Sequence, residues 1–190
     1  MRNLDLLLEK AKWDKLSKDE LAEVVQRIKQ YNEEDSEDLY TLLHTLGRSG
    51  AWEYRSLVEP FLSYTADPMI PRIALKTLCD YWNLTSSYLD ILKEFITGVE
   101  WDEDAVVRVV AISISGEYIR TTNDKSLLRL LLDIFENEKE EIEMRSFAYE
   151  AIARGIGVNY DQLPPVTVLA TFSKDVIDQA VVDEAYRKLE

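Results

Sequence analysis

Short amphipathic helices are the feature that most constrains the fold of this chain. Apolar residues recur at the i, i+3, i+4, i+7 spacing of one helix face, whereas the strict alternation typical of strands is almost absent. The segment 21–28 is one example, and it follows a capping box formed by Ser17 and Glu20. The same pattern predicts helices over residues 3–13, 17–31, 36–47, 51–64, 68–82, 86–98, 104–120, 124–137, 141–155 and 173–189. Each helix is too short to be stable alone, so we expect an all-α fold in which the helices pack on one another.

An internal repeat runs through the middle of the chain. Arg72, Arg108 and Arg145 are separated by 36 and 37 residues, and each opens an apolar helix soon after an acidic or proline-rich turn. Small or apolar residues recur in register three and seven positions after each arginine. A more divergent copy aligns Leu39 with Arg72, 33 residues earlier. Such a period indicates stacked helix pairs, because one pair exposes an apolar face that only a neighbouring pair can bury.

The residues of this repeat resemble the helix–turn–helix unit of the HEAT-repeat family, one of the HEAT-like and armadillo-type α-solenoids. The resemblance covers about residues 36–155 and rests on two copies of the unit. The motif residues are Pro60, Asp67-Pro68 and Pro71-Arg72 in one copy, and Asp104, Val107-Arg108, Ala111 and Gly116 in the other. In that family the arginine ties neighbouring repeats together through a turn acid, here Asp67 or Asp104.

The resemblance implies a right-handed α-solenoid of about four to five antiparallel helix pairs with terminal capping helices. It also implies a single HEAT-like domain over residues 1–190. Its parts would be an N-terminal cap over 1–35, the repeats over 36–155, a linker over 156–171 and a C-terminal capping helix over 172–190. Solenoids of this kind usually bind a partner along their curved surface.

Composition excludes several classes of protein. The chain has 22 Lys and Arg against 36 Asp and Glu, a formal net charge of −14, so we expect no nucleic-acid partner. One His and one Cys leave no disulfide framework and no Cys- or His-rich metal site, and we expect no metal or cofactor. The chain shows no signal-peptide pattern and no run of about 20 apolar residues. We therefore expect a cytoplasmic protein without a membrane partner.

Three acidic clusters occupy the same position of the repeat, the turn between its first and second helix. They consist of Glu33, Glu34, Asp35, Glu37 and Asp38; Glu100, Asp102, Glu103 and Asp104; and Glu136, Glu138, Glu140, Glu141 and Glu143. Equivalent turns align along one edge of a solenoid, so the clusters would form an acidic ridge. The ridge is either a docking edge for a basic protein or a set of helix N-terminal acids that favour the macrodipole and solubility.

The second helices of the pairs would line the concave surface of the solenoid. Their non-core positions supply candidate partner-binding residues, because Tyr and Arg are enriched among binding hot spots; half-buried packing is the alternative. These candidates are Tyr40, His44, Lys76, Tyr81 and Tyr118. His44 has no nucleophile beside it in the sequence, and Cys79 is expected to be a small buried apolar residue. We assign no catalytic residue.

These features favour a non-catalytic protein-binding module that grips a basic protein partner. Bacterial immunity proteins fit by resemblance, since small acidic helical proteins of that class neutralise basic nuclease toxins. A scaffold, adaptor or assembly factor is the first alternative. A HEAT-like enzyme, of the DNA glycosylase or chromophore lyase type, is the second, although the net charge argues against the glycosylase.

Overall fold

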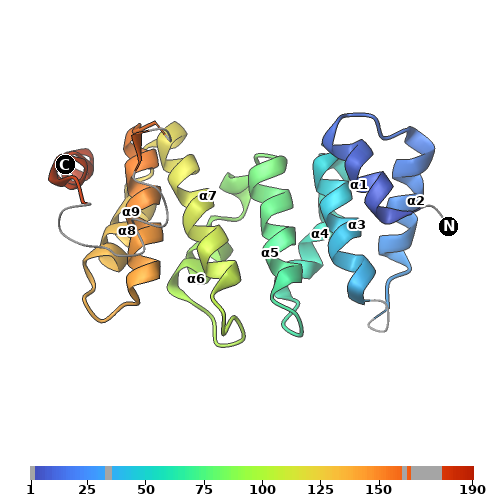
Figure 1. Cartoon of the computed structure of the whole chain (residues 1–190), viewed down its shortest axis with the longest axis horizontal. Coiled ribbons are helices and arrows are strands. Elements are labelled where there is room, and N and C mark those ends of the chain that lie inside the picture. Colours follow the sequence, from blue (N-terminus) through green and yellow to red (C-terminus); the bar gives the residue numbers. More distant parts are fainter. Residues whose placement is uncertain (1–2, 33–35, 160–161, 164–176) are drawn as a thin grey trace. The chain divides into compact units, whose positions relative to one another are not determined.

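The computed structural model describes residues 3–32, 36–159, 162–163 and 177–190, with the side chains of residues 36 and 37 left out (Figure 1). The described residues form helices and turns and include no strand, which confirms the predicted all-α class. They divide into two compact units. Unit 1 comprises residues 1–90 and 98–107, and unit 2 comprises residues 91–97 and 108–190.

Unit 1 is built around α3 (Ser36–Arg48), on which both α1 (Leu4–Lys12) and α2 (Lys18–Lys29) pack. The predicted capping box begins α2: the Ser17 hydroxyl accepts from the Glu20 N–H at 3.3 Å, and the Glu20 carboxylate accepts from the Ser17 N–H at 2.9 Å. Lys10 of α1 donates to the same carboxylate at 2.5 Å. These bonds, that from Lys10 first, lower the pKa of Glu20 to about 2 and tie the first two helices together.

The rest of unit 1 is a series of shorter helices. They are η2 (Trp52–Tyr54), α4 (Arg55–Val58), η3 (Glu59–Ser63), α5 (Met69–Leu75), η4 (Lys76–Tyr81) and η5 (Thr85–Ser87). The single helix predicted over 51–64 is therefore wrong in detail, because it breaks into two 3₁₀ pieces around one α turn. Pro60 has no N–H to continue an α-helical ladder, and it lies in the first turn of η3.

A second departure from the prediction occurs in the helix expected over 68–82. It begins as α5 but continues as η4, a π-helix, in which the hydrogen bonds span five residues instead of four. The Trp82 N–H closes this turn by donating to the Thr77 carbonyl at 3.0 Å. The helical periodicity of the sequence does not distinguish an α turn from a π turn over so short a segment.

Unit 2 contains most of α6 (Leu89–Thr97) and of α7 (Val106–Thr122), together with α8 (Lys125–Glu136), α9 (Ile142–Ile156) and α11 (Gln179–Leu189). The α8 and α9 helices pack on each other, and α11 packs on both (Figure 1). Asp124 caps α8 and Asp178 caps α11, each through its carboxylate. In α9, Gly157 ends the helix with a positive φ of 102°.

Helices α7 and α9 approach each other closely within unit 2. A Cβ built on Gly116 of α7 would lie 2.6 Å from the Ala151 carbonyl oxygen of α9, so only glycine fits there. One turn further along α9, a Cβ on Gly155 would lie 3.0 Å from the Ile119 side chain. This crossing is a contact between backbones, and it leaves little freedom for either helix to shift.

The helix predicted over 173–189 is present from Gln179 to Leu189, and residues 164–176 lie outside the described part of the chain. Among the described residues, no helix is both long enough and apolar enough to cross a membrane. The predicted single domain and the boundaries of its caps and linker stay predictions.

Candidate functional site: a cationic aromatic face on α3 and η4

One face of α3 carries the first part of the candidate site. Tyr40, His44 and Arg48 are spaced four residues apart, so their side chains lie above one another along the helix. The rings of Tyr40 and His44 meet edge to face, with their centroids 6.0 Å apart. The His44 ring also stacks on that of Tyr81 at 5.8 Å with an interplanar angle of 7°, and its Nε2 lies 3.2 Å from the Tyr81 hydroxyl.

The π-helix η4 supplies the second part of the site. In a π-helix, residues five apart lie close to one above the other, because the hydrogen bonds join residue i to residue i+5. Lys76 and Tyr81 are five apart, and the Lys76 ammonium lies 5.4 Å from the centre of the Tyr81 ring. Asp80 pairs with Lys76 at 2.8 Å. An ordinary α-helical turn would point Lys76 and Tyr81 in different directions.

Contacts below the surface lock η4 against α3. The buried Trp82 indole N–H donates to the Gly47 carbonyl at 3.1 Å. A Cβ on Gly47 would lie 2.5 Å from the Thr77 hydroxyl oxygen and 2.7 Å from Cδ2 of Tyr81. Glycine at this position therefore allows Tyr81 to reach His44, and the Trp82 bond holds the two helices at that distance.

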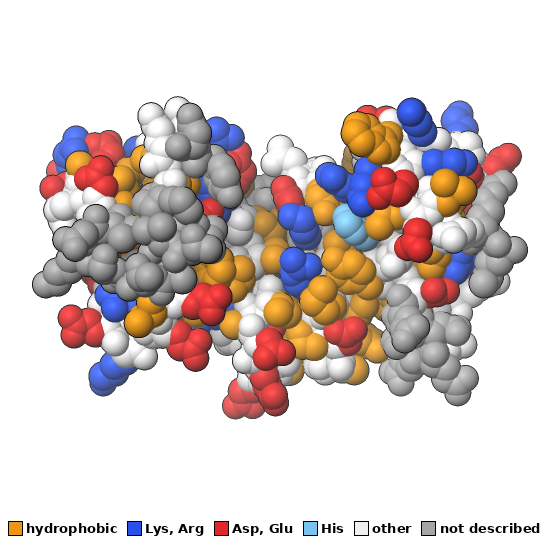
Figure 2. Space-filling model, viewed as in Figure 1, with side chains coloured by type: hydrophobic (Ala, Val, Ile, Leu, Met, Phe, Trp, Pro, Cys, Tyr) orange, Lys and Arg blue, Asp and Glu red, His pale blue; other side chains and the backbone are white. Residues whose placement is uncertain are grey.

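The face is electrically positive, and its cations contribute to a lowered pKa of His44. The pKa of its imidazole falls from 6.5 to about 4, first because the ring is partly buried and then because cations surround it. These cations are Arg48, Lys12, Lys76 and Arg72. Figure 2 shows basic and hydrophobic side chains gathered around the histidine. His44 is thus neutral at pH 7, and it serves as a flat ring and hydrogen-bond partner for Tyr81.

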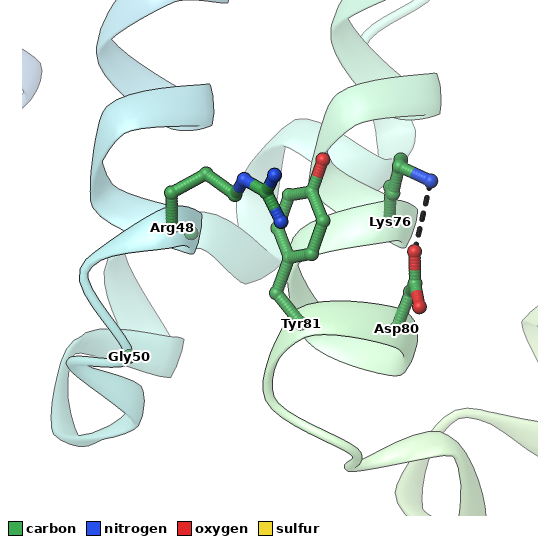
Figure 3. Close-up of a pocket in the computed structure, with 6 residues that line it drawn as sticks. Arg48, Gly50, Lys76, Asp80 and Tyr81 are labelled. Atoms are coloured by element: carbon green, nitrogen blue, oxygen red, sulfur yellow. Dashed lines mark ion pairs between the residues drawn. The ribbon is translucent and has the colours of Figure 1, made fainter. Parts of the chain in front are cut away.

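A pocket of about 490 Å³ opens beside the Tyr81 ring. We call it the Tyr81 pocket, and its lining consists of Gly47, Arg48, Gly50, Lys76, Asp80 and Tyr81. The Arg48 guanidinium reaches across from α3 and lies 5.0 Å from the ring centre, as Figure 3 shows. Partial burial raises the pKa of the Tyr81 hydroxyl above its ordinary value, so the hydroxyl stays protonated at neutral pH.

The structure brings together four of the five residues predicted for the concave surface. Tyr40, His44, Lys76 and Tyr81 belong to this one face, while Tyr118 lies on α7 in unit 2. Arg48, Asp80 and Gly47 complete the site. Arg48 and Asp80 are also non-core positions of the predicted second helices, and the i, i+4, i+8 spacing places Arg48 on the same helix face as Tyr40 and His44. The π turn carried no signal in the sequence pattern, whereas Gly47 lies at the repeat position that Gly116 occupies in a later copy.

The predicted acidic ridge residues fall into three groups: those outside the described residues, exposed acids, and acids with partners inside the chain. Glu33, Glu34 and Asp35 lie outside the described residues, as does the side chain of Glu37. The exposed acids include Glu100, Glu103 and Asp104 on unit 1, and Glu138, Glu141 and Glu143 on unit 2. Their alignment along one edge stays a prediction.

The other ridge acids have partners inside the chain. Asp38 pairs with Arg27 at 2.8 Å, and Glu136 accepts from the Tyr186 hydroxyl. Asp102 is only 7% exposed, and its carboxylate accepts from the Val107 N–H at 2.9 Å near the start of α7. A surface role predicted for Asp102 does not fit its burial, because its position in the turn makes it a cap.

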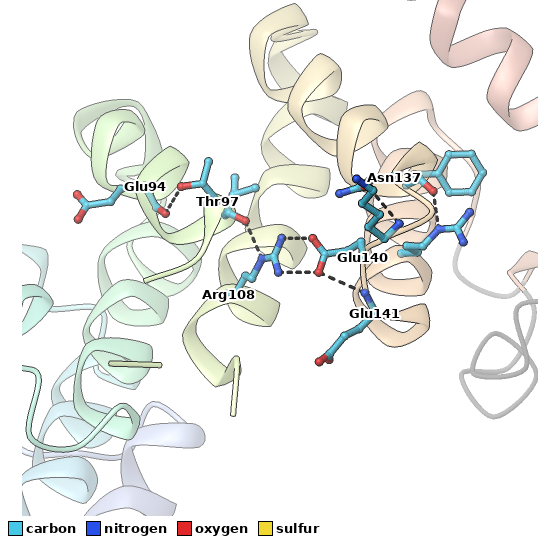
Figure 4. Close-up of polar contacts among 10 residues, drawn as sticks. Glu94, Thr97, Arg108, Asn137, Glu140 and Glu141 are labelled. Atoms are coloured by element: carbon cyan, nitrogen blue, oxygen red, sulfur yellow. Dashed lines mark hydrogen bonds and ion pairs between the residues drawn. The ribbon is translucent and has the colours of Figure 1, made fainter. Parts of the chain in front are cut away.

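The repeat arginines have structural roles that differ in detail from the expectation. Arg108 forms a bidentate pair with Glu140, at 3.0 and 2.7 Å, instead of pairing with Asp104 (Figure 4). Its Nε donates to the Ile96 carbonyl at 2.9 Å, and Arg145 Nε donates in the same way to the Phe135 carbonyl at 2.9 Å. Each arginine thus binds the last turn of the preceding helix, where carbonyls lack helical partners.

Glu140 is therefore a structural residue as well as a predicted ridge residue. The Arg108 guanidinium holds its pKa below the ordinary value, and Glu140 lies 32 positions along the chain from Arg108. The third repeat arginine, Arg72, donates to the Tyr40 hydroxyl at 3.4 Å, while Asp67 accepts from the Met69 N–H. Arg72, for which the family resemblance implies a role in packing between repeats, thus also contacts Tyr40 of the candidate site.

The remaining reactive side chains fit the structural expectation. Cys79 is buried as predicted, and burial raises the pKa of its thiol to about 12. Among the described residues, no group of three or more His, Cys, Asp or Glu side chains is placed to hold a metal ion.

Comparison of the chain with protein-family models, with curated proteins and with solved structures finds no significant match.

Proposed function

We propose that this protein is a non-catalytic protein-binding module of HEAT-like helix pairs stacked as an α-solenoid. Two features of the repeat support the stacking. Gly47 and Gly116 each lie eight residues after an aligned repeat position, Leu39 or Arg108, and each allows a close approach to a helix about one period further along the chain. The pair between Arg108 and Glu140 likewise joins residues separated by about one period.

The single observation that carries the binding function is the preorganised face formed by α3 and η4. Its rings are fixed by stacking and hydrogen bonding, so a partner loses little side-chain entropy there on binding. Tyr and Arg dominate binding hot spots, and here they lie together beside an open pocket.

The protonation states of the reactive side chains favour binding over catalysis. With a pKa of about 4, His44 is a weak base at pH 7 and is bonded to Tyr81. The Cys79 thiol is buried and protonated, so it is a poor nucleophile.

The exposed acids favour a partner whose surface is basic where it meets them, as distinct from the part that meets the positive face of α3 and η4. Glu138, Glu141 and Glu143 lie near the start of α9. Among the described residues, none of the three forms an ion pair. Opposite charge on a partner would steer it to this edge and speed association at low salt.

Affinity capture with the purified full chain tests this proposal. The bait is the wild type, the double variant Arg48→Gln/Tyr81→Ala, or the matched control Arg120→Gln, which removes an exposed arginine from unit 2. We expect the wild type and the control to retain one protein stoichiometrically, more strongly at low salt, and the double variant to lose it. A protein retained equally by all three baits would contradict a role for the face, and retention of no protein would contradict the binding function.

A further inference from the structure

The distribution of charge around the Tyr81 pocket runs against that of the whole chain. Acids outnumber basic residues by 36 to 22. Arg48 and Arg72 nevertheless lie near this pocket without any carboxylate in ion-pairing distance among the described residues. Arg48 contacts the Tyr81 ring, and Arg72 donates to the Tyr40 hydroxyl. Within the described part of the chain, the positive charges of Arg48 and Arg72 are therefore not neutralised by an ion pair, although the chain is rich in acids.

The charge balance of the pocket lining fits one negative charge. Lys76 and Asp80 neutralise each other through their 2.8 Å pair, so Arg48 supplies the remaining positive charge. Arg48 is also the last residue of α3, where the negative end of the helix macrodipole opposes further negative charge. Asp80 would repel a dianion such as phosphate. A singly charged carboxylate matches this balance better.

The geometry of the site suits a carboxylate. The guanidinium of Arg48 faces the Tyr81 ring, so the N–H groups at its edge can donate to two carboxylate oxygens in the plane (Figure 3). Gly50 has a φ of +70°, and a Cβ built there would meet nothing within 4 Å, so the pocket is open at this side.

We propose that the Tyr81 pocket is a binding site for a single carboxylate group, held by the guanidinium of Arg48 with the Tyr81 ring beneath it. The carboxylate belongs either to a small aromatic or aliphatic organic acid or to a glutamate or aspartate side chain of a peptide. This inference stands apart from the proposed protein-binding function, because a free organic acid would satisfy it equally.

Two pairs of probes, each differing only in charge, test the inference by NMR titration of the labelled full chain. One pair is benzoate and benzamide, and the other is a blocked Gly-Glu-Gly peptide and its Gly-Gln-Gly counterpart. Inorganic phosphate is the fifth probe. We expect saturable shifts at the Gly47 and Gly50 amides with at least one carboxylate probe. The protein should bind this carboxylate probe about tenfold more tightly than the corresponding amide and than phosphate. That difference is the effect of one charge-assisted hydrogen-bonded pair.

Variants complete the test. Arg48 is exposed, and its substitution in Arg48→Gln should weaken carboxylate binding by about tenfold. The matched control Arg120→Gln should leave it unchanged, with far-UV circular dichroism confirming that both variants fold. Tighter binding of benzoate than of the glutamate peptide identifies a small acid as the ligand, and the reverse order identifies a peptide. Equal binding of acid and amide, preference for phosphate, unchanged binding by Arg48→Gln, or no saturable shift would each overturn the proposal.

Discussion

Gly47 in unit 1 and Gly116 in unit 2 occupy aligned positions of the repeat, yet they face different surroundings. A Cβ on Gly116 would collide with backbone, at 2.6 Å from the Ala151 carbonyl oxygen and 2.8 Å from its Cα. A Cβ on Gly47 would collide with side chains, those of Thr77 and Tyr81. The same glycine position therefore allows a backbone crossing in unit 2 and makes room for an aromatic side chain of the candidate site in unit 1.

This difference separates a region of close helix packing from the candidate site. In unit 2 the close approach ends in a buried helix crossing, and the arginines nearby bind carbonyls and Glu140. In unit 1 the close approach continues into an exposed face with an open pocket. Changes to the two regions should accordingly affect different measurements, stability in unit 2 and binding in unit 1.

Substitution of Gly116 by alanine should have the largest effect on stability. The Ala151 backbone cannot rotate away as a side chain can, so the helices must separate. We expect the free energy of unfolding to fall by about 3 kcal/mol, the range of overpacked cores, despite the better helix propensity of alanine. Urea denaturation followed by circular dichroism measures this. A stable Gly116→Ala protein would show that the α7–α9 crossing is looser than described.

Removal of the guanidinium in Arg108→Gln should have the next largest effect. It breaks the half-buried pair with Glu140 and the bond to the Ile96 carbonyl, and we expect a loss of about 2 kcal/mol. Arg120→Gln, which breaks an exposed pair with Glu117, should lose less than about 0.5 kcal/mol. Equal losses in urea denaturation would mean that Arg108 contributes no more than a surface pair.

Gly47→Ala should cost less stability than Gly116→Ala but disturb the site more. Thr77 and Tyr81 can move by rotating their side chains, so we expect a loss of about 1 kcal/mol. The Tyr81 ring would shift off His44, and the His44 ring signals in NMR spectra should change. If those signals stay in place while stability falls by as much as in Gly116→Ala, the distinction drawn between the two glycines is wrong.

Charge reversal of the exposed acids should have the smallest effect on stability. Glu138→Lys, Glu141→Lys and Glu143→Lys together should leave helicity unchanged, because these side chains are exposed, and should weaken capture of a basic partner at low salt. Glu140→Lys is the matched contrast, since it places a cation against Arg108 and should lower the melting temperature. Capture that is unaffected by the triple reversal would remove this edge from the binding surface.

The helix positions and much of the site could be predicted from the sequence, because both follow from spacing along regular helices. Tyr40 and His44 lie one α turn apart, and the capping box at Ser17 appears as its spacing indicates. The π turn that joins Lys76 to Tyr81 could not be predicted, since it depends on how η4 packs against α3. The partner of Arg108 was also missed, because pairing over 32 residues is set by tertiary packing.

The pKa of His44 is the most direct test of the cationic aromatic face. As the only histidine, it can be followed by NMR without ambiguity as pH falls. The face predicts a midpoint of about 4, and Arg48→Gln should raise it. Between pH 6.5 and 4 the unfolded chain binds a proton that the folded chain does not, so His44 should make stability fall as pH falls through this range. A midpoint near 6.5, unchanged by Arg48→Gln, would contradict a His44 ring that is partly buried, stacked on Tyr81 and surrounded by cations.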